Sequence, residues 1–341
     1  MSKLRVGVVG AGLWGSNHAH AFNVLPETEL VAVCDIDGDR AKKMQQASGA
    51  PLAFTNFNEL VARDDIDAVT IATPDFTHTA IVLAALKAGK HVLSEKPLAT
   101  TVEEARQIAD AADAAPGKLM IDFHNRVNPV FTQMQALVAD GRIGEPRHGM
   151  ARLSNTSWVP CEMLSWGARS SALWFLGSHL TDLLRFVLGD EVSRVYAVTR
   201  KGGLAAMGVD TQDFHSCILE FSRGAVFTME NSWILSQDNP SLVDFKLEVV
   251  GNKGQIQADP THNGGLRHIT DGKLRFADYI GIVPTGPSRI GGFVLESIAR
   301  FVDSVVHDAP LLADAHDGLA NTRILAAIER SAATGQPVDL P

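Results

Sequence analysis

Two side chains that could do acid–base chemistry lie in the stretch Ser94-Glu95-Lys96-Pro97. The preceding segment, Lys90 to Leu93, is typical of a buried strand. Burying a charged side chain at the end of such a strand costs free energy, so a charge there is expected to have a function. From position alone, a surface salt bridge between Glu95 and Lys96 explains the pair equally well. Both residues are therefore candidates for acid–base chemistry on a bound ligand.

A glycine-rich stretch near the N-terminus indicates which ligand this is. The apolar run Val6 to Val9 leads directly into Gly10-Ala11-Gly12-Leu13-Trp14-Gly15. Gly10 permits a tight turn, Gly12 lets the backbone approach a pyrophosphate, and Gly15 lets a helix pack closely against the strand. The phosphates would then lie over the free N–H groups of the helix N-terminus. The pattern predicts a dinucleotide site, with a glycine-rich turn in another kind of α/β protein as the alternative.

An acidic residue completes this pattern. Asp35 follows Gly15 by 20 residues and ends the apolar run Leu30 to Cys34, as does the acid that binds the ribose in dinucleotide sites. Because Asp35 would repel a 2′-phosphate, we expect NAD, while the nearby Arg40 and Lys42 keep NADP as an alternative. Beside a cationic nicotinamide, the ammonium form of Lys96 is disfavoured, which eases proton exchange with an alcohol.

Three further stretches carry polar side chains. Two of them follow apolar segments, and the third lies within an apolar helix. In Ala72-Thr73-Pro74 the proline fixes a turn, and Thr73 lies where a cofactor should run, whereas His78 taken alone is typical of a surface residue at a helix start. The stretch Asp122 to Arg126 marks the end of the predicted sheet. His179 and Asp182 are three residues apart on one face of an apolar helix; taken alone, His179 is typical of a hydrogen-bonded core histidine.

No metal site is predicted. His18 and His20 flank the first helix at i, i+2 spacing, which places them on different faces. The cysteines Cys34, Cys161 and Cys217 are far apart in the chain and odd in number, so we expect neither a disulfide framework nor zinc, and a reducing cytoplasm fits them best.

The elements that position these residues alternate in the first third of the chain. Apolar strands and helices follow one another to residue 123, which predicts a doubly wound parallel sheet with its ligand beyond the carboxyl ends of the strands. After residue 124 come long alternating strands and a helix over 172–188, which predict an α+β domain with a large open, mainly antiparallel sheet. We expect domains at 1–123 and 124–341, and self-association through the open sheet.

Composition limits the partners. The 341 residues exceed what one core usually holds. The net charge of −9 argues against nucleic acid and anionic membranes as partners. The sequence shows no signal-peptide pattern and no apolar run of about 18 residues, so we expect a cytoplasmic protein without a membrane partner.

Together these motifs resemble the Gfo/Idh/MocA family of oxidoreductases. The resemblance rests on four motifs in family order: Gly10 to Gly15, Ala72-Thr73-Pro74 with His78, Glu95-Lys96-Pro97, and Gly177-x-His179-x-x-Asp182. It implies a Rossmann domain, a C-terminal α/β domain with an open sheet that forms homodimers or homotetramers, and NAD(P)-dependent chemistry on a secondary alcohol of a sugar or cyclitol. It also implies that Lys96 contacts the reacting oxygen, that Glu95 lies by the nicotinamide ribose, and that His179 is the acid/base.

The expected contacts follow from the motifs and the resemblance together. Catalysis is assigned to Lys96 and His179. The expected cofactor contacts are Gly10, Gly12, Leu13, Trp14, Gly15, Asp35, Ile36, Arg40, Ala72, Thr73, Pro74, His78, Glu95 and Lys96. The candidate substrate contacts are Lys96, His124, Asn125, Arg126, Asn155, Trp158, Trp166, His179 and Asp182; core packing explains the two tryptophans equally well.

One position departs from the family pattern. Many family dehydrogenases carry Asp-x-Gly-x-His, and here Phe175 occupies the position of the Asp. Asp182 or Asp122 are candidates to replace that carboxylate. The departure leaves two alternatives beside a dehydrogenase: a redox-neutral lyase or glycosidase that retains NAD, and a non-catalytic dinucleotide-binding sensor.

Overall fold

The computed structural model describes residues 3–262, 267–270, 273–276, 281–286 and 289–341. Contacts within the chain define two compact units, one of residues 1–124 and 282–322 and the other of residues 125–281 and 323–341. The sequence placed all residues after 123 in the second domain, whereas segment 282–322 packs with the first unit. Within the described residues, no helix is both long and apolar enough to cross a membrane.

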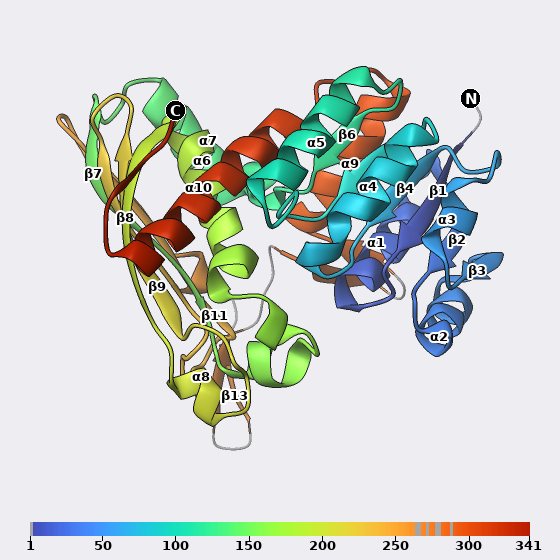
Figure 1. Cartoon of the computed structure of the whole chain (residues 1–341), viewed down its shortest axis with the longest axis horizontal. Coiled ribbons are helices and arrows are strands. Elements are labelled where there is room, and N and C mark those ends of the chain that lie inside the picture. The colour runs from blue at the N-terminus through green and yellow to red at the C-terminus, as the bar shows by residue number, and fades with distance from the viewer. Residues whose placement is uncertain (1–2, 263–266, 271–272, 277–280, 287–288) are drawn as a thin grey trace. The chain divides into compact units, whose positions relative to one another are not determined.

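The first unit is built on a parallel sheet of six strands in the order β3-β2-β1-β4-β5-β6. Its strands are β1 (Leu4–Val9), β2 (Thr28–Cys34), β3 (Leu52–Phe54), β4 (Ala68–Ile71), β5 (His91–Ser94) and β6 (Leu119–Ile121). The strand order reverses between β1 and β4, which places the expected ligand crevice at their carboxyl ends. The doubly wound sheet predicted from the alternating pattern is confirmed (Figure 1).

Local signals in the sequence set several helix ends of this unit. The helices are α1 (Leu13–Val24), α2 (Gly38–Ser48), α3 (Phe57–Val61), α4 (His78–Lys87), α5 (Val102–Ala114), α9 (Phe293–Val306) and the start of α10 (Ala315–Thr334). Asp37 caps α2 by accepting from the amides of Asp39 and Arg40, and Gly49 ends it with φ 73°. A short ribbon of β15 (Val283–Gly286) and β16 (Arg289–Gly291) precedes α9.

The second unit holds a seven-stranded mixed sheet in the order β12-β11-β7-β10-β9-β8-β17. Its strands are β7 (Pro146–Asn155), β8 (Val192–Arg200), β9 (Phe214–Phe221), β10 (Val226–Ser232), β11 (Val243–Gly251), β12 (Gln255–Ala258) and β17 (Val338–Asp339). Among the described strands of this sheet, only β7 and β10 pair in parallel, so the prediction of a mainly antiparallel sheet is confirmed. The unit also contains α6 (Pro129–Ala139), α7 (Ser178–Leu188), α8 (Gly203–Ala206), β13 (Arg267–Thr270), β14 (Lys273–Phe276) and the end of α10.

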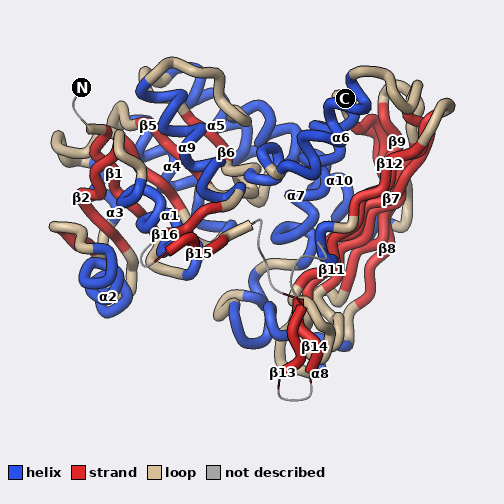
Figure 2. Tube along the Cα trace, turned by 180° about the vertical axis from the view of Figure 1, so that it is seen from behind, coloured by secondary structure: helices blue, strands red, loops and turns tan. Residues whose placement is uncertain are grey.

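One face of this sheet is covered and the other is open. Figures 1 and 2 both show α6 and α7 packed along one face, where side chains such as Leu219 and Phe227 are fully buried. The opposite face presents Tyr196 and Ile218, which lie opposite each other on β8 and β9 and are about 40% exposed (38% and 42%). The alternation of buried and exposed residues along β9 follows from this one-sided packing.

Glycines 12 and 15 give a matched test of the turn between β1 and α1. A Cβ on Gly15 would lie 1.7 Å from the carbonyl oxygen of Gly10, whereas a Cβ on Gly12 would meet nothing within 4 Å. We expect Gly15→Ala to lower the free energy of unfolding by about 1–3 kcal/mol through overpacking, and Gly12→Ala to change it by less than about 0.5 kcal/mol. Urea denaturation measures both, and equal stability of the two variants would contradict the close packing of α1 on the turn.

Candidate functional site

The glycine turn and Asp35 form one hydrogen-bonded unit. Gly10 has φ 104°, and a Cβ on it would lie 2.3 Å from the carbonyl oxygen of Ala72, so glycine is required where β1 and β4 converge. The Asp35 carboxylate accepts from the amides of Ala11 and Asp37, at 2.8 and 2.9 Å. It is thereby fixed beside the start of α1, where the dinucleotide pattern requires an acid.

Apolar side chains are exposed around this turn. Leu13 is 63% exposed and Ile36 is 90% exposed, although large aliphatic side chains are usually buried. Both residues were expected cofactor contacts. Their exposure agrees with that expectation, because a bound planar ligand would cover them.

His78 does not lie on the surface, so that interpretation of the residue was wrong. It is almost fully buried, and its ring nitrogens lie 2.8 Å from the carbonyl oxygen of Pro97 and 3.0 Å from that of Thr73. His78 therefore ties the loop after β4 to the loop after β5. A contact between its ring and the cofactor stays a prediction.

Glu95 and Lys96 are buried, which excludes the alternative of a surface salt bridge. They are 5% and 8% exposed. Burial lowers the pKa of Lys96, and the charges of Glu95, Asp75 and Asp122 oppose that effect. Lys96 thus lies where desolvation favours loss of its proton and neighbouring carboxylates favour its retention.

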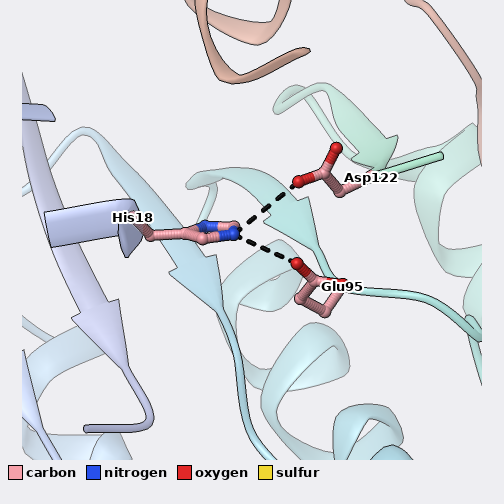
Figure 3. Close-up of side chains that lie close together, drawn as sticks. All are labelled: His18, Glu95 and Asp122. Atoms are coloured by element: carbon pink, nitrogen blue, oxygen red, sulfur yellow. Dashed lines mark hydrogen bonds and ion pairs between the residues drawn. The ribbon is translucent and has the colours of Figure 1, made fainter. Parts of the chain in front are cut away.

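The Lys96 region contains a buried histidine that the sequence analysis missed as a site residue. Figure 3 shows His18 of α1 pointing at Glu95 and Asp122. Its Nε2 lies 3.2 Å from Glu95 Oε1 and 3.6 Å from Asp122 Oδ2, and its Nδ1 lies 2.7 Å from Thr70 Oγ1. The spacing of His18 and His20 gave no hint of this, because the partners of His18 follow or lie on β4, β5 and β6.

The spacing of this cluster would also suit a metal ion. One ligand atom from each of His18, Glu95 and Asp122 lies within 4.8 Å of the others. The hydrogen bond between His18 Nε2 and Glu95, with Asp122 Oδ2 3.6 Å from the same nitrogen, gives this spacing without an ion.

His124, a candidate substrate contact, packs among aromatic rings of the first unit. Its ring stacks on Trp14 with centroids 5.5 Å apart, and Phe293 of α9 lies 5.5 Å from it. Burial lowers the pKa of His124 to about 4, so its ring is neutral at pH 7. The stack holds Trp14, an expected cofactor contact, at the start of α1.

In the second unit, an irregular turn presents His179. The predicted helix over 172–188 is a π-helical turn at Leu173–Gly177 followed by α7. A Cβ on Gly177 would lie 2.9 Å from Asn231 Oδ1, so glycine allows the turn to approach β10. π turns of this kind occur often at functional sites. His179, at the second position of α7, lies with its Nδ1 3.4 Å from the Nδ2 of Asn125.

The position where the family pattern has a carboxylate is apolar in this chain. The Phe175 ring lies 6.1 Å from that of Trp166 and 5.7 Å from that of Trp233. Asp182 accepts from Arg126 Nε and Nη2 at 3.0 and 2.6 Å, in a bidentate pair. Asp182 is thus committed to a guanidinium, which weakens its candidacy as a replacement for the missing carboxylate.

The structure distributes the predicted residues between the two units. Lys96, His124 and the expected cofactor contacts belong to the first unit, and the other candidate substrate contacts belong to the second. Asn155 is buried and Trp158 is 41% exposed. Residues that the sequence analysis did not single out, but that contact residues it named, are His18, Trp233 and Ser297; Thr70 in turn contacts His18.

Comparison with known proteins agrees with the fold and the motifs. Residues 4–123 match the model of the oxidoreductase family with an NAD-binding Rossmann fold, and residues 131–257 match the GFO/IDH/MocA C-terminal domain. The first unit thus defines the chain as an oxidoreductase with an NAD-binding Rossmann fold. The chain belongs to the Gfo/Idh/MocA family, and the resemblance seen in the sequence is confirmed.

Similar proteins match over nearly their whole length. The chain is 31% identical to inositol 2-dehydrogenase 3 of Saccharopolyspora erythraea, over 98% of this chain and 95% of that protein. It is 29% identical to myo-inositol 2-dehydrogenase of Thermotoga maritima, over 92% of each. The crystal structure of GenD2 from gentamicin A biosynthesis in complex with NAD superposes with a TM-score of 0.88 at 28% identity, covering 100% of this chain and 97% of that one.

The pair of Arg126 and Asp182 supports the second unit from within. Their side chains are 10% and 2% exposed. Breaking a buried pair leaves a charge poorly compensated, here with only Arg185 Nη1, 3.9 Å from Asp182 Oδ1, to offset it. We expect Arg126→Met to lower the free energy of unfolding by about 3–5 kcal/mol. Arg300→Met, which breaks the exposed pair with Glu296, should cost less than about 1 kcal/mol. Chemical denaturation checks both, and equal losses would contradict the importance of burial.

Proposed function

We propose that this protein is an NAD-dependent dehydrogenase that acts on a secondary alcohol of a sugar, a sugar derivative or a cyclitol. The observation that carries the proposal is the buried Glu95-Lys96 pair at the carboxyl edge of the Rossmann sheet. The names of the inositol dehydrogenases above, and of a D-glucoside 3-dehydrogenase of Escherichia coli that is 27% identical, support the substrate class.

Each catalytic residue has a role that its surroundings support. Lys96 donates a hydrogen bond to the reacting oxygen and stabilises the negative charge that develops there. His179 takes the hydroxyl proton, and because Asn125 lies at its Nδ1, we assign the exchange to Nε2. The dinucleotide, when bound, supplies the hydride acceptor. The candidate substrate contacts of the second unit would orient the hydroxyl groups.

Asp35 supports NAD over NADP. Its carboxylate is fixed by the amides of Ala11 and Asp37 and would repel a 2′-phosphate. Arg40 could offset this repulsion, but it lies 3.3 Å from the carboxylate of Asp37. Cys34, Cys161 and Cys217 are free, which supports the cytoplasm as the compartment.

Phe175 favours one alternative activity. With an aromatic ring where many family dehydrogenases carry a carboxylate, a redox-neutral lyase or glycosidase that retains NAD is the second candidate. It differs from a dehydrogenase in one measurable way: nicotinamide absorbance stays constant at steady state while product appears.

A screen of cyclitols, aldoses, sugar acids and glycosides with both NAD and NADP tests these roles. We expect reduction of NAD, and a fall in kcat of about 10²–10⁴-fold in Lys96→Met and in His179→Gln because each loses a proton donor or acceptor. The exposed residues Lys43 and His307 provide matched controls, Lys43→Met and His307→Gln, which should retain wild-type turnover. Wild-type turnover in Lys96→Met would refute the assignment, and product without absorbance change would favour the redox-neutral enzyme.

We also propose that the open face of the seven-stranded sheet forms a homodimer or homotetramer. One row across this face joins Tyr196, Ile218, Thr228 and Met150 on adjacent strands, and exposed apolar side chains on a sheet face favour a partner surface. Light scattering at micromolar concentration should show an oligomer, and Ile218→Glu should shift it towards monomer. A monomeric wild-type protein would contradict this proposal.

A further inference from the structure

His18 lies on the helix that begins at the glycine turn, and its side chain is 0% exposed. Its ring faces Thr70 on β4, Glu95 after β5 and Asp122 after β6. The mechanism proposed above assigns no role to it. A buried imidazole between two carboxylates is nevertheless an uncommon arrangement, because buried charge has to be compensated.

Glu95 connects His18 to the backbone of Lys96. Glu95 Oε1 lies 3.2 Å from His18 Nε2, and the backbone amide of Lys96 donates to Glu95 Oε2 at 3.3 Å. The amide of Glu95 itself donates to the carbonyl oxygen of Ile71, the last residue of β4. A single carboxylate therefore links α1 to the residue that is proposed to contact the reacting oxygen.

Asp122 closes the cluster from the other side. Its Oδ1 accepts a hydrogen bond from Ser297 of α9, and its Oδ2 lies 3.6 Å from His18 Nε2. It is 0% exposed. Burial and the charge of Glu95 raise the pKa of Asp122 to about 7, and a cation beside the two carboxyl groups relieves their mutual repulsion.

We propose that His18 is a positioning residue that carries a proton between Glu95 and Asp122 and thereby holds Glu95, and through it Lys96, in place. The inference rests on the proposed role of Lys96. His18 itself touches neither substrate nor reacting atoms in this account. It acts through Glu95.

The electrostatics of the cluster agree with this geometry. Burial alone would lower the pKa of His18, but the hydrogen bond and charge of Glu95, with the charge of Asp122, raise it above its ordinary value. Burial alone would raise the pKa of Glu95, but His18, Lys96 and His124 hold it below its ordinary value. The Thr70 hydroxyl, which faces Nδ1, is neutral and can accept from a protonated Nδ1, and burial keeps the nearby His124 neutral at pH 7.

A double-mutant cycle separates positioning from packing. The variants are His18→Leu, Glu95→Gln and the two combined, with His18→Gln as the conservative replacement and His20→Leu as the matched control on the same helix. If His18 acts through Glu95, the free-energy losses of the two single variants do not add up in the double variant. If His18 only fills space, these free-energy losses add, which means that the two fold-losses multiply.

NAD affinity, measured by calorimetry on the full chain, is the first readout because it needs no substrate. We expect His18→Leu and Glu95→Gln each to weaken NAD binding by about tenfold, which corresponds to about 1.4 kcal/mol. The double variant should be no more than about threefold weaker than Glu95→Gln alone. His18→Gln keeps a neutral donor near Glu95 and should recover most of the affinity, and His20→Leu should match wild type.

Once a substrate is found, the same non-additive result should appear in kcat. We expect His18→Leu to lower kcat by about ten- to hundredfold, as is typical of residues that orient a reactive group without touching the substrate. KM should change by less than about threefold, because His18 does not touch substrate. If the screen finds no oxidised substrate, the proposed function fails while calorimetry still decides the role of His18.

Nitrogen NMR of the imidazole tests the proton directly in the wild-type protein, with His18→Gln providing the assignment. We expect the protonated form of His18 to persist to higher pH than that of a free histidine, whose pKa is near 6.5. A ring that is neutral from pH 6 to 8, losses that multiply in the cycle, or one tightly bound metal ion per chain by mass spectrometry would each overturn the proposal.

Discussion

The site in the first unit depends on the compensation of buried charge at one edge of a parallel sheet. Glu95, Lys96 and Asp122 follow adjacent strands, and parallel strands bring their carboxyl ends to the same edge. An isolated buried ion would lose several kcal/mol of solvation free energy, on the order of the stability of a domain. The cluster is tolerated because His18 lies between the two carboxyl groups, within hydrogen-bonding distance of Glu95 and 3.6 Å from Asp122.

In the second unit, one polar side chain, His179, is presented from the otherwise apolar helix α7. The π-helical turn at Leu173–Gly177 precedes α7 and packs Phe175 against Trp166 and Trp233. On the same helix, the buried carboxylate of Asp182 is neutralised by a bidentate pair with Arg126. His179 is therefore set among groups that are already paired or apolar, and an amide, that of Asn125, lies at its Nδ1.

The sequence predicted those features that depend on neighbours in the chain. Asp37 and Gly49 mark the two ends of α2 because caps act over a few residues, and the glycine turn was recognised from spacing alone. His18 and His78 were misjudged because their partners lie 52–104 and 5–19 residues away. Ser297, which bonds to Asp122 across 175 residues, could not be found from local pattern, because nothing near it in the chain indicates that α9 returns to the first unit.

Burial and charge act on Lys96 in opposite directions, and both are needed for the proposed chemistry. Burial alone would favour a neutral amine, which has lost the charge that stabilises an alkoxide. Carboxylates alone would hold the ammonium so firmly that it could not share its proton. Asp75, Glu95 and Asp122 offset the desolvation of Lys96, and the strength of that offset depends on how much negative charge Glu95 and Asp122 retain. Since His18 faces both carboxylates, the protonation of a side chain remote from the reacting atoms sets the electrostatic environment of the lysine.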